Sequence, residues 1–351
     1  MTTRTKPLLI TMGDAAGIGP EIIARVFRDS PEDLAGCVVV GDVATLRRAA
    51  ALAAAQDGNL LMPVAQLDFL ADLSSVPPNC IGVLQKCRLP ALVPYGQISD
   101  LAGQAAADCI VWAARAVLAG QAAAMVTAPI HKEALAAAGG WAARFPGHTE
   151  MLQTEAAAFL GKPVSEVPVR MMLANDELKT VLVSIHMSLR NAIEAVTFDS
   201  VLQTLRITHR AVSASLGRPP RIAVAGLNPH AGEGGRFGSE EQMIIAPAIA
   251  AALQEGLNAW GPFAPDTVFM RARNTPTKPG EFDVVVAMYH DQGLIPVKYL
   301  GVEQGVNVTL GLPLVRTSPD HGTAFDIAGT GQADASSLLA AIRMARQLAV
   351  S

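Results

Sequence analysis

Charged residues are scarce in this chain, and neither sign of charge dominates. Only 17% of the 351 residues are Asp, Glu, Lys or Arg, and the formal net charge is −4. So small a net charge does not indicate a nucleic-acid partner or an acidic tail. Half of the residues are apolar, which is enough for a large core and for two subdomains.

Cysteine is also rare, and its spacing carries no metal or redox motif. The four cysteines, Cys37, Cys80, Cys87 and Cys109, form no CxxC pair and lie in or near apolar runs. We therefore expect buried, reduced thiols in preference to a disulfide or a metal role.

The first apolar run, Leu8–Met12, is too short for a signal peptide or a membrane span. Two alanine-rich stretches, Ala49–Ala55 and Ala105–Ala124, contain or adjoin charged residues and glutamines, as packed helices of soluble proteins do. A cytoplasmic protein without a membrane partner is expected.

Apolar strand-like runs alternate with helical patterns along the chain. Strands are predicted over residues 6–12, 37–40, 123–127, 169–174, 179–185 and 221–226, and helices over 20–28, 43–55, 101–119, 149–160, 198–216, 240–255 and 335–350. Asn175–Glu177 is expected to form the turn between two paired strands. The alternation predicts an α/β/α architecture with a largely parallel sheet. Pro77–Pro94 and Thr275–Glu281 are the most loop-like stretches, but neither is a clean linker.

The common nucleotide-binding signatures are missing as well. Gly13–Glu21 follows a strand and opens a helix, with Pro20 suited to the first helical position and Glu21 to the helix dipole. This turn is neither GxGxxG nor a Walker loop. It is either a tight structural turn or a place where an anion approaches the backbone.

Two further segments begin helices beside polar side chains. In Thr127–Lys132, the lysine either pairs with a substrate carboxylate, moves protons or is simply solvated. In Phe145–Glu150, His148 and Thr149 are placed to bind an oxyanion or to cap the helix.

Three histidines lie in short Gly/Pro/Asp-rich stretches: His186 in SIHMSLR, His230 in GLNPHAGEGG and His290 in AMYHDQG. His230 and His290 follow apolar runs typical of buried strands, where α/β proteins place their chemistry. A lone histidine is more often structural, but three in such loops favour a shared metal site with open coordination positions. Asp291 is then available to orient an imidazole or to act as a base.

Three polar residues, Lys298, Asn307 and Arg316, stand in apolar or glycine-rich stretches. Cations in such surroundings usually have an anionic partner. A phosphate group is one such partner, and ion pairs within the protein are the alternative.

These motifs resemble the 4-hydroxythreonine-4-phosphate dehydrogenase family of pyridoxal phosphate biosynthesis over essentially the whole chain. The most specific matches are GLNPHAGEGG, AMYHDQG, GVNVTLGLP and RTSPDHGTA. The resemblance implies an isocitrate/isopropylmalate dehydrogenase-like fold with two α/β/α subdomains and a cleft between them. Residues 1–125 plus 310–351 are expected to form the first subdomain, and 126–309 the second. It also implies a homodimer whose active sites take residues from both subunits.

The resemblance also implies roles for individual residues. His186, His230 and His290 are implied as ligands of one divalent ion (Zn, Mg or Co), with His290 coming from the partner subunit. The phosphorylated substrate is expected to contact a set of five residues: His148, Thr149, Lys298, Asn307 and Arg316. The stretch Asp320–Gly331 resembles the adenosine-binding loop of isopropylmalate dehydrogenases, which bind NAD without GxGxxG. In this loop His321, Gly322, Thr323 and Asp326 are expected to bind NAD or NADP, unless Asp326 merely caps the following turn.

The implied reaction is oxidation of 4-phosphooxy-L-threonine to a 3-oxo acid, which decarboxylates to 3-amino-2-oxopropyl phosphate. Asp291, Asp266 and Lys132 are the candidates for proton transfer. The turn DAAG stands where the family usually has DPAG, and ANDE and SIHMSLR are more like members that act on other substrates. The alternatives are therefore threonate or erythronate 4-phosphate, or an aromatic dicarboxylate cis-dihydrodiol. A non-catalytic metal- or phosphometabolite-binding protein is the alternative of another class, although the adenosine loop argues against it.

Overall fold

The structure is a computed structural model that describes residues 6–57 and 61–349. These residues divide into two compact units, unit 1 (the described residues up to Pro168, with Leu312–Ala349) and unit 2 (Val169–Gly311). Each unit is a sheet with helices, so the predicted α/β class is confirmed.

Unit 1 begins with a parallel sheet built from short strands, most of which are apolar and buried. Its elements are β1 (Leu8–Thr11), α1 (Gly19–Asp29), β2 (Cys37–Gly41), α2 (Val43–Asp57), β3 (Val64–Leu67), β4 (Ile81–Gln85), α3 (Asp100–Leu118), β5 (Ala124–Thr127), α4 (Lys132–Ala137), α5 (His148–Leu160), β12 (Arg316–Pro319) and α11 (Ser336–Ala349). The strand order is β3-β4-β2-β1-β5-β12, and the pairs are parallel. Continuous apolar strands of this kind are typical of sheets covered on both faces.

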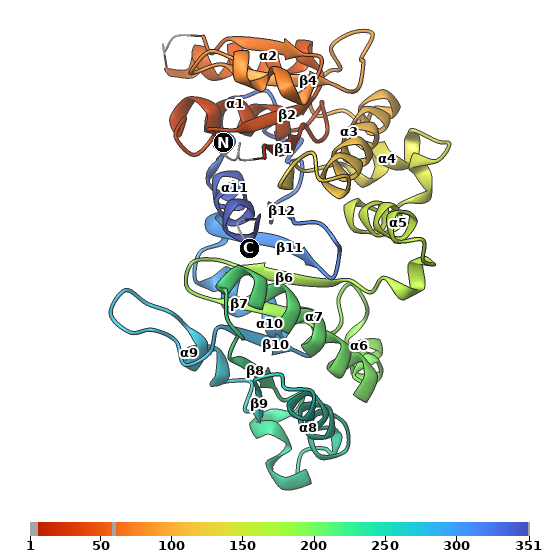
Figure 1. Ribbon diagram of the computed structural model, residues 1–351, viewed down its shortest axis with the longest axis vertical. Helices are drawn as coiled ribbons and strands as arrows, with labels where there is room; N and C mark the ends of the chain where they lie inside the picture. Colours follow the sequence, from red (N-terminus) through yellow and green to blue (C-terminus); the bar gives the residue numbers. More distant parts are fainter. Residues whose placement is uncertain (1–5, 58–60, 350–351) are drawn as a thin grey trace. The chain divides into compact units, whose positions relative to one another are not determined.

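Helices cover the sheet of unit 1 in two groups. Helix α1 contacts both α2 and α11, and α3 contacts both α4 and α5 in the second group (Figure 1). The blue C-terminal helix α11 lies in the same unit as the red β1 and α1, because β12 pairs with β5. Among the described residues one helix, α3, is long and apolar enough to span a membrane, but it is mostly buried inside the protein.

Unit 2 has a mixed sheet. Its elements are β6 (Arg170–Ala174), β7 (Lys179–Leu182), α6 (Leu189–Ala195), α7 (Phe198–Leu216), β8 (Ile222–Ala225), α8 (Ala246–Gln254), β9 (Ala259–Phe263), α9 (Val268–Ala272), β10 (Val284–Ala287), α10 (His290–Tyr299) and β11 (Val306–Leu310). The order is β11-β6-β7-β10-β8-β9. Strand β6 is antiparallel to both neighbours, whereas β7, β10, β8 and β9 run parallel.

Local sequence explains several element ends. Helix α7 begins with a capping box in which Thr197 and Ser200 exchange hydrogen bonds, and it ends at Gly217 in the left-handed conformation. The predicted helix 198–216 is therefore confirmed at both ends. The predicted turn Asn175–Glu177 is also confirmed, because Asn175 Oδ1 accepts hydrogen bonds from the amides of Glu177 and Leu178.

The prediction was wrong within Pro77–Pro94, where Ile81–Gln85 forms the buried strand β4. The flanking prolines made the stretch look like a loop, but they lie outside the strand and leave its hydrogen bonds intact. Helix α10 was also missed, because Gly293 and Pro296 lie inside it. The four cysteines are free thiols; Cys37, Cys87 and Cys109 are buried as expected, whereas Cys80 is only half-buried. Burial raises the pKa of Cys37 to about 11.

The first unit boundary differs from the one expected at residues 125/126. Residues 126–168 belong to unit 1, since α4 and α5 pack on α3. At Gly103 of α3, a Cβ would lie 2.0 Å from the carbonyl oxygen of Ala134 in α4. Only glycine permits so close an approach of two backbones.

Candidate functional site

Two glycine-rich segments of unit 1 meet beside the end of β1. They are the turn Gly13–Glu21 and the segment Asp320–Gly331, here called the cofactor loop. The amide of Ile18 donates a hydrogen bond to the carbonyl oxygen of Thr323 (3.0 Å). A Cβ at Gly17 would lie 2.9 Å from Cβ of Thr323. The turn therefore supports the cofactor loop, a role that the sequence analysis did not assign to it.

Glu21 joins these two segments from the buried side. Its side chain is buried, although Glu is rarely found there without partners. Its two carboxylate oxygens accept hydrogen bonds from the amides of Gly329 and Ala333, both at 3.3 Å. Glu21 was interpreted from the sequence only as a complement to the helix dipole, because its partners lie more than 300 residues away in the chain.

Aromatic contacts complete the support of the cofactor loop. The ring of His131 stacks on Phe325, with centroids 4.4 Å apart. The guanidinium of Arg48 lies 3.9 Å from the centroid of Tyr95, whose ring sits where a Cβ of Gly329 would be. The conformation of the loop is thus fixed within unit 1.

The expected cofactor-binding residues all lie on this loop. Thr323 is buried and helps to anchor it, whereas Gly322 and Asp326 are exposed. A Cβ at Gly322 would meet open space. The exposed part of the loop therefore offers backbone and a carboxylate to a ligand.

Arg316 begins β12 and is buried. Its Nε and Nη2 donate hydrogen bonds to Oγ1 of Thr127 at the end of β5 (3.0 and 2.6 Å). Burial lowers the pKa of Arg316 to about 10, so the guanidinium stays charged at neutral pH. A buried cation beside a hydroxyl is suited to an anionic ligand.

His148 is the first residue of α5 and lies in the electrostatic field of Arg316. Burial, and then the charge of Arg316, lower the pKa of His148 well below its ordinary value, so the imidazole is neutral. Its buried Nε2 has no hydrogen-bond partner among the described residues. A buried polar atom without a partner calls for a ligand or water. Thr149, the next residue, is half-buried.

The remaining residues expected to bind substrate lie in unit 2. Lys298 is on the last turn of α10 and Asn307 on β11, and both are half-buried. The structure therefore brings Arg316 and His148 together, and places Lys298 and Asn307 in the other unit.

The three histidines lie beyond the carboxyl ends of three parallel strands of unit 2, and their loops are here called the histidine region. His186 follows β7, His230 follows β8 and His290 follows β10. The rings of His186 and His290 have centroids 5.7 Å apart, and both line a pocket of about 460 Å³. The sequence analysis had placed His230 and His290 at strand ends of this kind, and the structure adds His186.

The paired histidines fit a divalent metal ion. Two imidazoles bound to one ion through nitrogens at about 2.0–2.1 Å have ring centroids roughly 5 Å apart. Nδ1 of His290 lies 2.7 Å from Oδ1 of Asp291, which leaves Nε2 for a ligand. A carboxylate on the other ring nitrogen is the usual support of a metal-binding histidine.

His186 and His230 both have strained backbones. Their φ angles are 41° and 51°, in the left-handed region that residues with a Cβ rarely adopt. At His230 the strain continues, since residues 230–234 all have positive φ. Strain of this kind costs of the order of 1–3 kcal/mol per residue and is concentrated at functional sites.

Glu241 anchors, through hydrogen bonds, the residues that lead into the left-handed segment 230–234. The buried carboxylate accepts hydrogen bonds from the amides of Leu227 and Asn228 (both 2.7 Å) and from Nδ2 of Asn228 (3.0 Å). Burial by itself would raise the pKa of Glu241, but these hydrogen bonds outweigh it and the pKa is lowered. Glu241 lies in a single π-helical turn (Glu241–Ile245), a feature often found at functional sites.

Two more side chains tie the strand ends together. Oγ of Ser184 donates to the carbonyl oxygen of Met288 (3.0 Å) and so connects the ends of β7 and β10. Oε1 of Gln292 accepts from the amide of Met288 (2.7 Å), while its Nε2 donates to the carbonyl oxygen of Gly226 (2.7 Å). Ser184, Gln292 and Glu241 were missed in the sequence analysis. The signal was available in part, because the first two stand within two residues of a histidine already singled out.

His230 does not join the other two histidines in a single chain. Within residues 6–57 and 61–349, no group of three His, Cys, Asp or Glu side chains is arranged to hold a metal ion. The three candidates for proton transfer are exposed: Asp291 beside His290, Asp266 just before α9, and Lys132 at the start of α4.

The chain is similar to known proteins over its whole length. Residues 33–345 match the family model described as "Pyridoxal phosphate biosynthetic protein PdxA". A 4-hydroxythreonine-4-phosphate dehydrogenase of Beijerinckia indica is 51% identical over 98% of this chain and 95% of its own length. A D-threonate 4-phosphate dehydrogenase of Salmonella typhimurium is 42% identical over 98% of this chain and 99% of its own.

A solved structure agrees with these relatives. The crystal structure of 4-hydroxythreonine-4-phosphate dehydrogenase from Klebsiella pneumoniae superimposes with a TM-score of 0.86 at 40% identity, and covers 100% of both chains. This confirms the predicted fold class. The chain therefore belongs to the PdxA family of pyridoxal phosphate biosynthetic proteins and is an oxidoreductase of the dehydrogenase type.

Proposed function

We propose that this protein is a metal-dependent, NAD-linked dehydrogenase that oxidises 4-phosphooxy-L-threonine. The carbon that bears the hydroxyl gives a hydride to the nicotinamide and the hydroxyl oxygen gives its proton to a base, which leaves the 3-oxo acid and the reduced cofactor. This acid then loses CO₂ to give 3-amino-2-oxopropyl phosphate. Support comes from the relative that shares 51% identity and is named for this substrate.

The observation that carries the proposal is the pairing of His186 and His290. Two imidazoles, one with a strained backbone and the other supported by Asp291, face one pocket. Such an arrangement is expected of metal ligands rather than of core histidines.

The phosphate of the substrate is assigned to five residues. Arg316 supplies a buried charge and His148 a neutral imidazole with an unused Nε2. In our proposal Thr149, Lys298 and Asn307 complete the binding site. A neutral His148 adds no second buried charge beside Arg316, and its single N–H reaches a phosphate oxygen only in the tautomer that carries the proton on Nε2 instead of on the nitrogen facing Ala128.

The groups at the reacting carbon have separate roles. His186, His230 and His290 would hold a divalent ion, which would supply Lewis acidity that lowers the pKa of the substrate hydroxyl. Asp291 orients His290, so we assign it a positioning role. Asp266 and Lys132 are then the candidates for accepting the hydroxyl proton and for returning a proton after decarboxylation.

The hydride acceptor is assigned to the cofactor loop, through His321, Gly322, Thr323 and Asp326. Exposed Asp326 is placed to accept hydrogen bonds from the ribose hydroxyls and to repel a 2′-phosphate. NAD is therefore preferred over NADP. Replacing Asp326 with Asn should reduce that preference by roughly 5- to 150-fold in the ratio of kcat/KM values.

We propose a cytoplasmic homodimer in which ligands of each metal site come from both subunits. Because His186 and His290 pair within one chain, His230 is the ligand that we assign to the other subunit, in place of His290, which the resemblance implied. The histidine region exposes apolar side chains that a partner would cover: Met187, Leu189 and Ile193 are 47%, 59% and 41% exposed. Mixing inactive His230→Ala and His290→Ala chains should restore some activity, since one hybrid site would recover all its ligands. Inactive verified heterodimers would contradict shared sites.

The decisive experiment is NADH formation with 4-phosphooxy-L-threonine, measured with and without chelator and with Zn, Mg or Co added back. We expect chelator to abolish activity and metal to restore it. His186→Ala and His290→Ala should each lose at least tenfold in metal affinity. Activity that persists in chelator would contradict the proposal.

D-threonate 4-phosphate is the second candidate substrate. It is favoured by the relative named for it, at 42% identity, and by the ANDE and SIHMSLR segments. The same assay distinguishes the candidates when kcat/KM is compared for D-threonate 4-phosphate, erythronate 4-phosphate and 4-phosphooxy-L-threonine.

A further inference from the structure

Unit 2 has a second pocket at the opposite edge of its sheet from the histidines. It has a volume of about 310 Å³ and is here called the amino-edge pocket. Lys179 begins β7, and Arg221 and Asp283 immediately precede β8 and β10, so these three lie at the amino ends of the parallel strands. Four strand residues, roughly 13 Å of backbone, separate this edge from the carboxyl ends.

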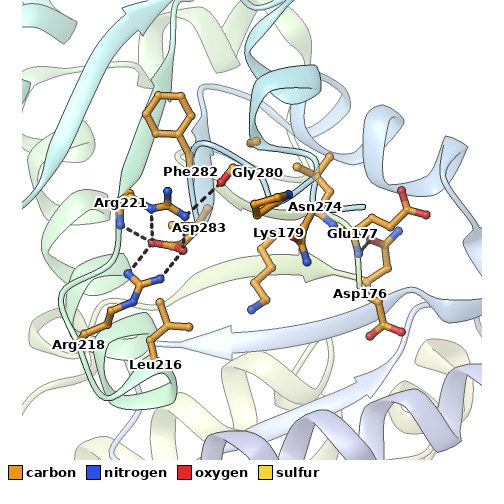
Figure 2. A pocket seen from close by; sticks show the side chains of 15 residues that line it. Asp176, Glu177, Lys179, Leu216, Arg218, Arg221, Asn274, Gly280, Phe282 and Asp283 are labelled. Atoms are coloured by element: carbon orange, nitrogen blue, oxygen red, sulfur yellow. Dashed lines mark hydrogen bonds and ion pairs between the residues drawn. The ribbon is translucent and has the colours of Figure 1, made fainter. Parts of the chain in front are cut away.

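One wall of the pocket is a saturated ion cluster (Figure 2). The carboxylate of Asp283 accepts hydrogen bonds from both guanidinium groups, of Arg218 and Arg221, and from the amide of Arg221. Burial alone would raise the pKa of Asp283, but these bonds hold it far below its ordinary value. Five N–H groups exceed the approximately four lone-pair positions of a carboxylate. Asp283 therefore has no acceptor capacity left for another donor.

Lys179 lines the same pocket but takes no part in the hydrogen bonds of the Asp283 cluster. Figure 2 shows its side chain extending into the space between the Asp283 cluster and Asp176. The ammonium group is half-buried and makes no hydrogen bond with the described residues, and burial lowers the pKa of Lys179 despite the nearby charges of Asp283 and Asp176. An ammonium group has three donors, and partial burial without acceptors is unfavourable.

The charges around the amino-edge pocket leave an excess of one. Arg218 and Arg221 with Asp283 contribute +1, and Lys179 with Asp176 contributes zero. Glu177 is cancelled by its ion pair with Arg273. A monoanion neutralises this excess, whereas a phosphate dianion would reverse it.

The uncharged residues that line the pocket indicate the chemistry of the uncharged part of the ligand. Leu216 and Phe282 supply apolar surface, and Asn274 supplies an amide. The volume corresponds to about ten water molecules and lies at the small end of ligand pockets. We propose that the amino-edge pocket binds a small monocarboxylate with an apolar body, whose carboxylate pairs with Lys179.

The test is binding of propionate to the full-length protein, measured by saturation-transfer NMR and by titration, with n-propanol and inorganic phosphate as comparison probes. We expect propionate to bind, n-propanol not to bind, and phosphate to compete weakly. Lys179→Met should weaken propionate binding by roughly tenfold or more, because a charge-assisted hydrogen bond is lost. Lys179→Arg should keep binding within about threefold.

Lys162→Met is the matched control, since it removes an exposed lysine from unit 1. Circular dichroism and the unfolding midpoint establish that Lys179→Met is folded. Equal affinity of Lys179→Met and wild type would overturn the proposal, as would tighter binding of phosphate than of propionate. Propionate binding that is lost in Arg316→Gln but kept in Lys179→Met would place the anion at the substrate site instead, and would also overturn it.

Discussion

The cofactor loop of unit 1 and the histidine region of unit 2 differ in what stabilises their backbone conformations. The cofactor loop rests on buried Glu21, on Thr323 and on stacked aromatic rings, so most of its contacts are made within its own unit. In the histidine region, His186 and His230 are exposed and have left-handed backbones.

The comparison shows where each region gets its stability. The cofactor loop is held by its own unit, since the amides of Asp320, Ile327, Gly329 and Thr330 already have acceptors there. The histidine region keeps a strained backbone by means of one buried carboxylate, Glu241, and two bridging side chains, Ser184 and Gln292. Substitutions should therefore be most damaging at Glu241 and milder in the cofactor loop.

The largest effect is expected for Glu241→Gln. The amide removes a charged acceptor from beneath the left-handed turn, which should cost about 3 kcal/mol of unfolding free energy. Because His230 would lose its support, metal affinity should fall by about tenfold. Denaturant unfolding and metal titration measure the two effects. Glu233→Gln, at an exposed position in the same turn, should leave both nearly unchanged.

The same variant has a pH signature. The pKa of Glu241 is lowered in the folded state, so its stabilisation is fully present above the ordinary Glu pKa of about 4.3 and is lost as pH falls through the folded value. The stability gap between wild type and Glu241→Gln should therefore narrow in acid. A gap that widens in acid would contradict this assignment.

A smaller effect is expected for Gly17→Ala. Its new Cβ would lie 2.9 Å from the side chain and 3.0 Å from the carbonyl oxygen of Thr323, so the cofactor loop must shift. We expect a loss of about 2 kcal/mol in unfolding free energy and a higher KM for NAD. Gly322→Ala in the same loop meets open space and should leave stability unchanged. Equal losses in both variants would show that the two segments do not depend on their close contact.

Glu21→Gln should have a weaker effect again. Its two hydrogen bonds to backbone amides are long, at 3.3 Å, and glutamine keeps one acceptor oxygen. We expect a loss of about 1 kcal/mol in stability and a severalfold higher KM for NAD with kcat unchanged. A fall in kcat without a change in KM would argue against a positioning role.

The smallest effect concerns His148 and is seen only as a pH dependence. The pKa of His148 is lowered by burial and by Arg316, so the unfolded chain binds more protons in mild acid. The corresponding stability is fully present above the ordinary His pKa of about 6.5 and is lost as pH falls below it. His148→Gln should flatten the pH dependence of the unfolding free energy in this range, and an unchanged slope would contradict the role assigned to burial.

The sequence was most informative where function depends on local patterns. The structure has the glycine-rich turn after β1, and His230 and His290 after β8 and β10, where the sequence analysis expected them. In each case a continuous apolar run, which indicates a buried strand, or a helical hydrophobic pattern stands directly beside Gly, Pro or Asp. The same rule failed at β4 and α10, because prolines and glycines there are tolerated by the tertiary surroundings.

The sequence by itself determined the α/β alternation, the reduced cysteines and the candidate residues, since these follow from periodicity and residue chemistry over a few neighbouring positions. Only the tertiary structure decided that Glu21 supports a loop 308 residues away, that Glu241 holds the turn of His230, and that Lys179 is left without a hydrogen-bond partner among the described residues. The physical reason is that burial and hydrogen-bond partners depend on which distant segments meet. A carboxylate or an ammonium group has no fixed role until its surroundings are known.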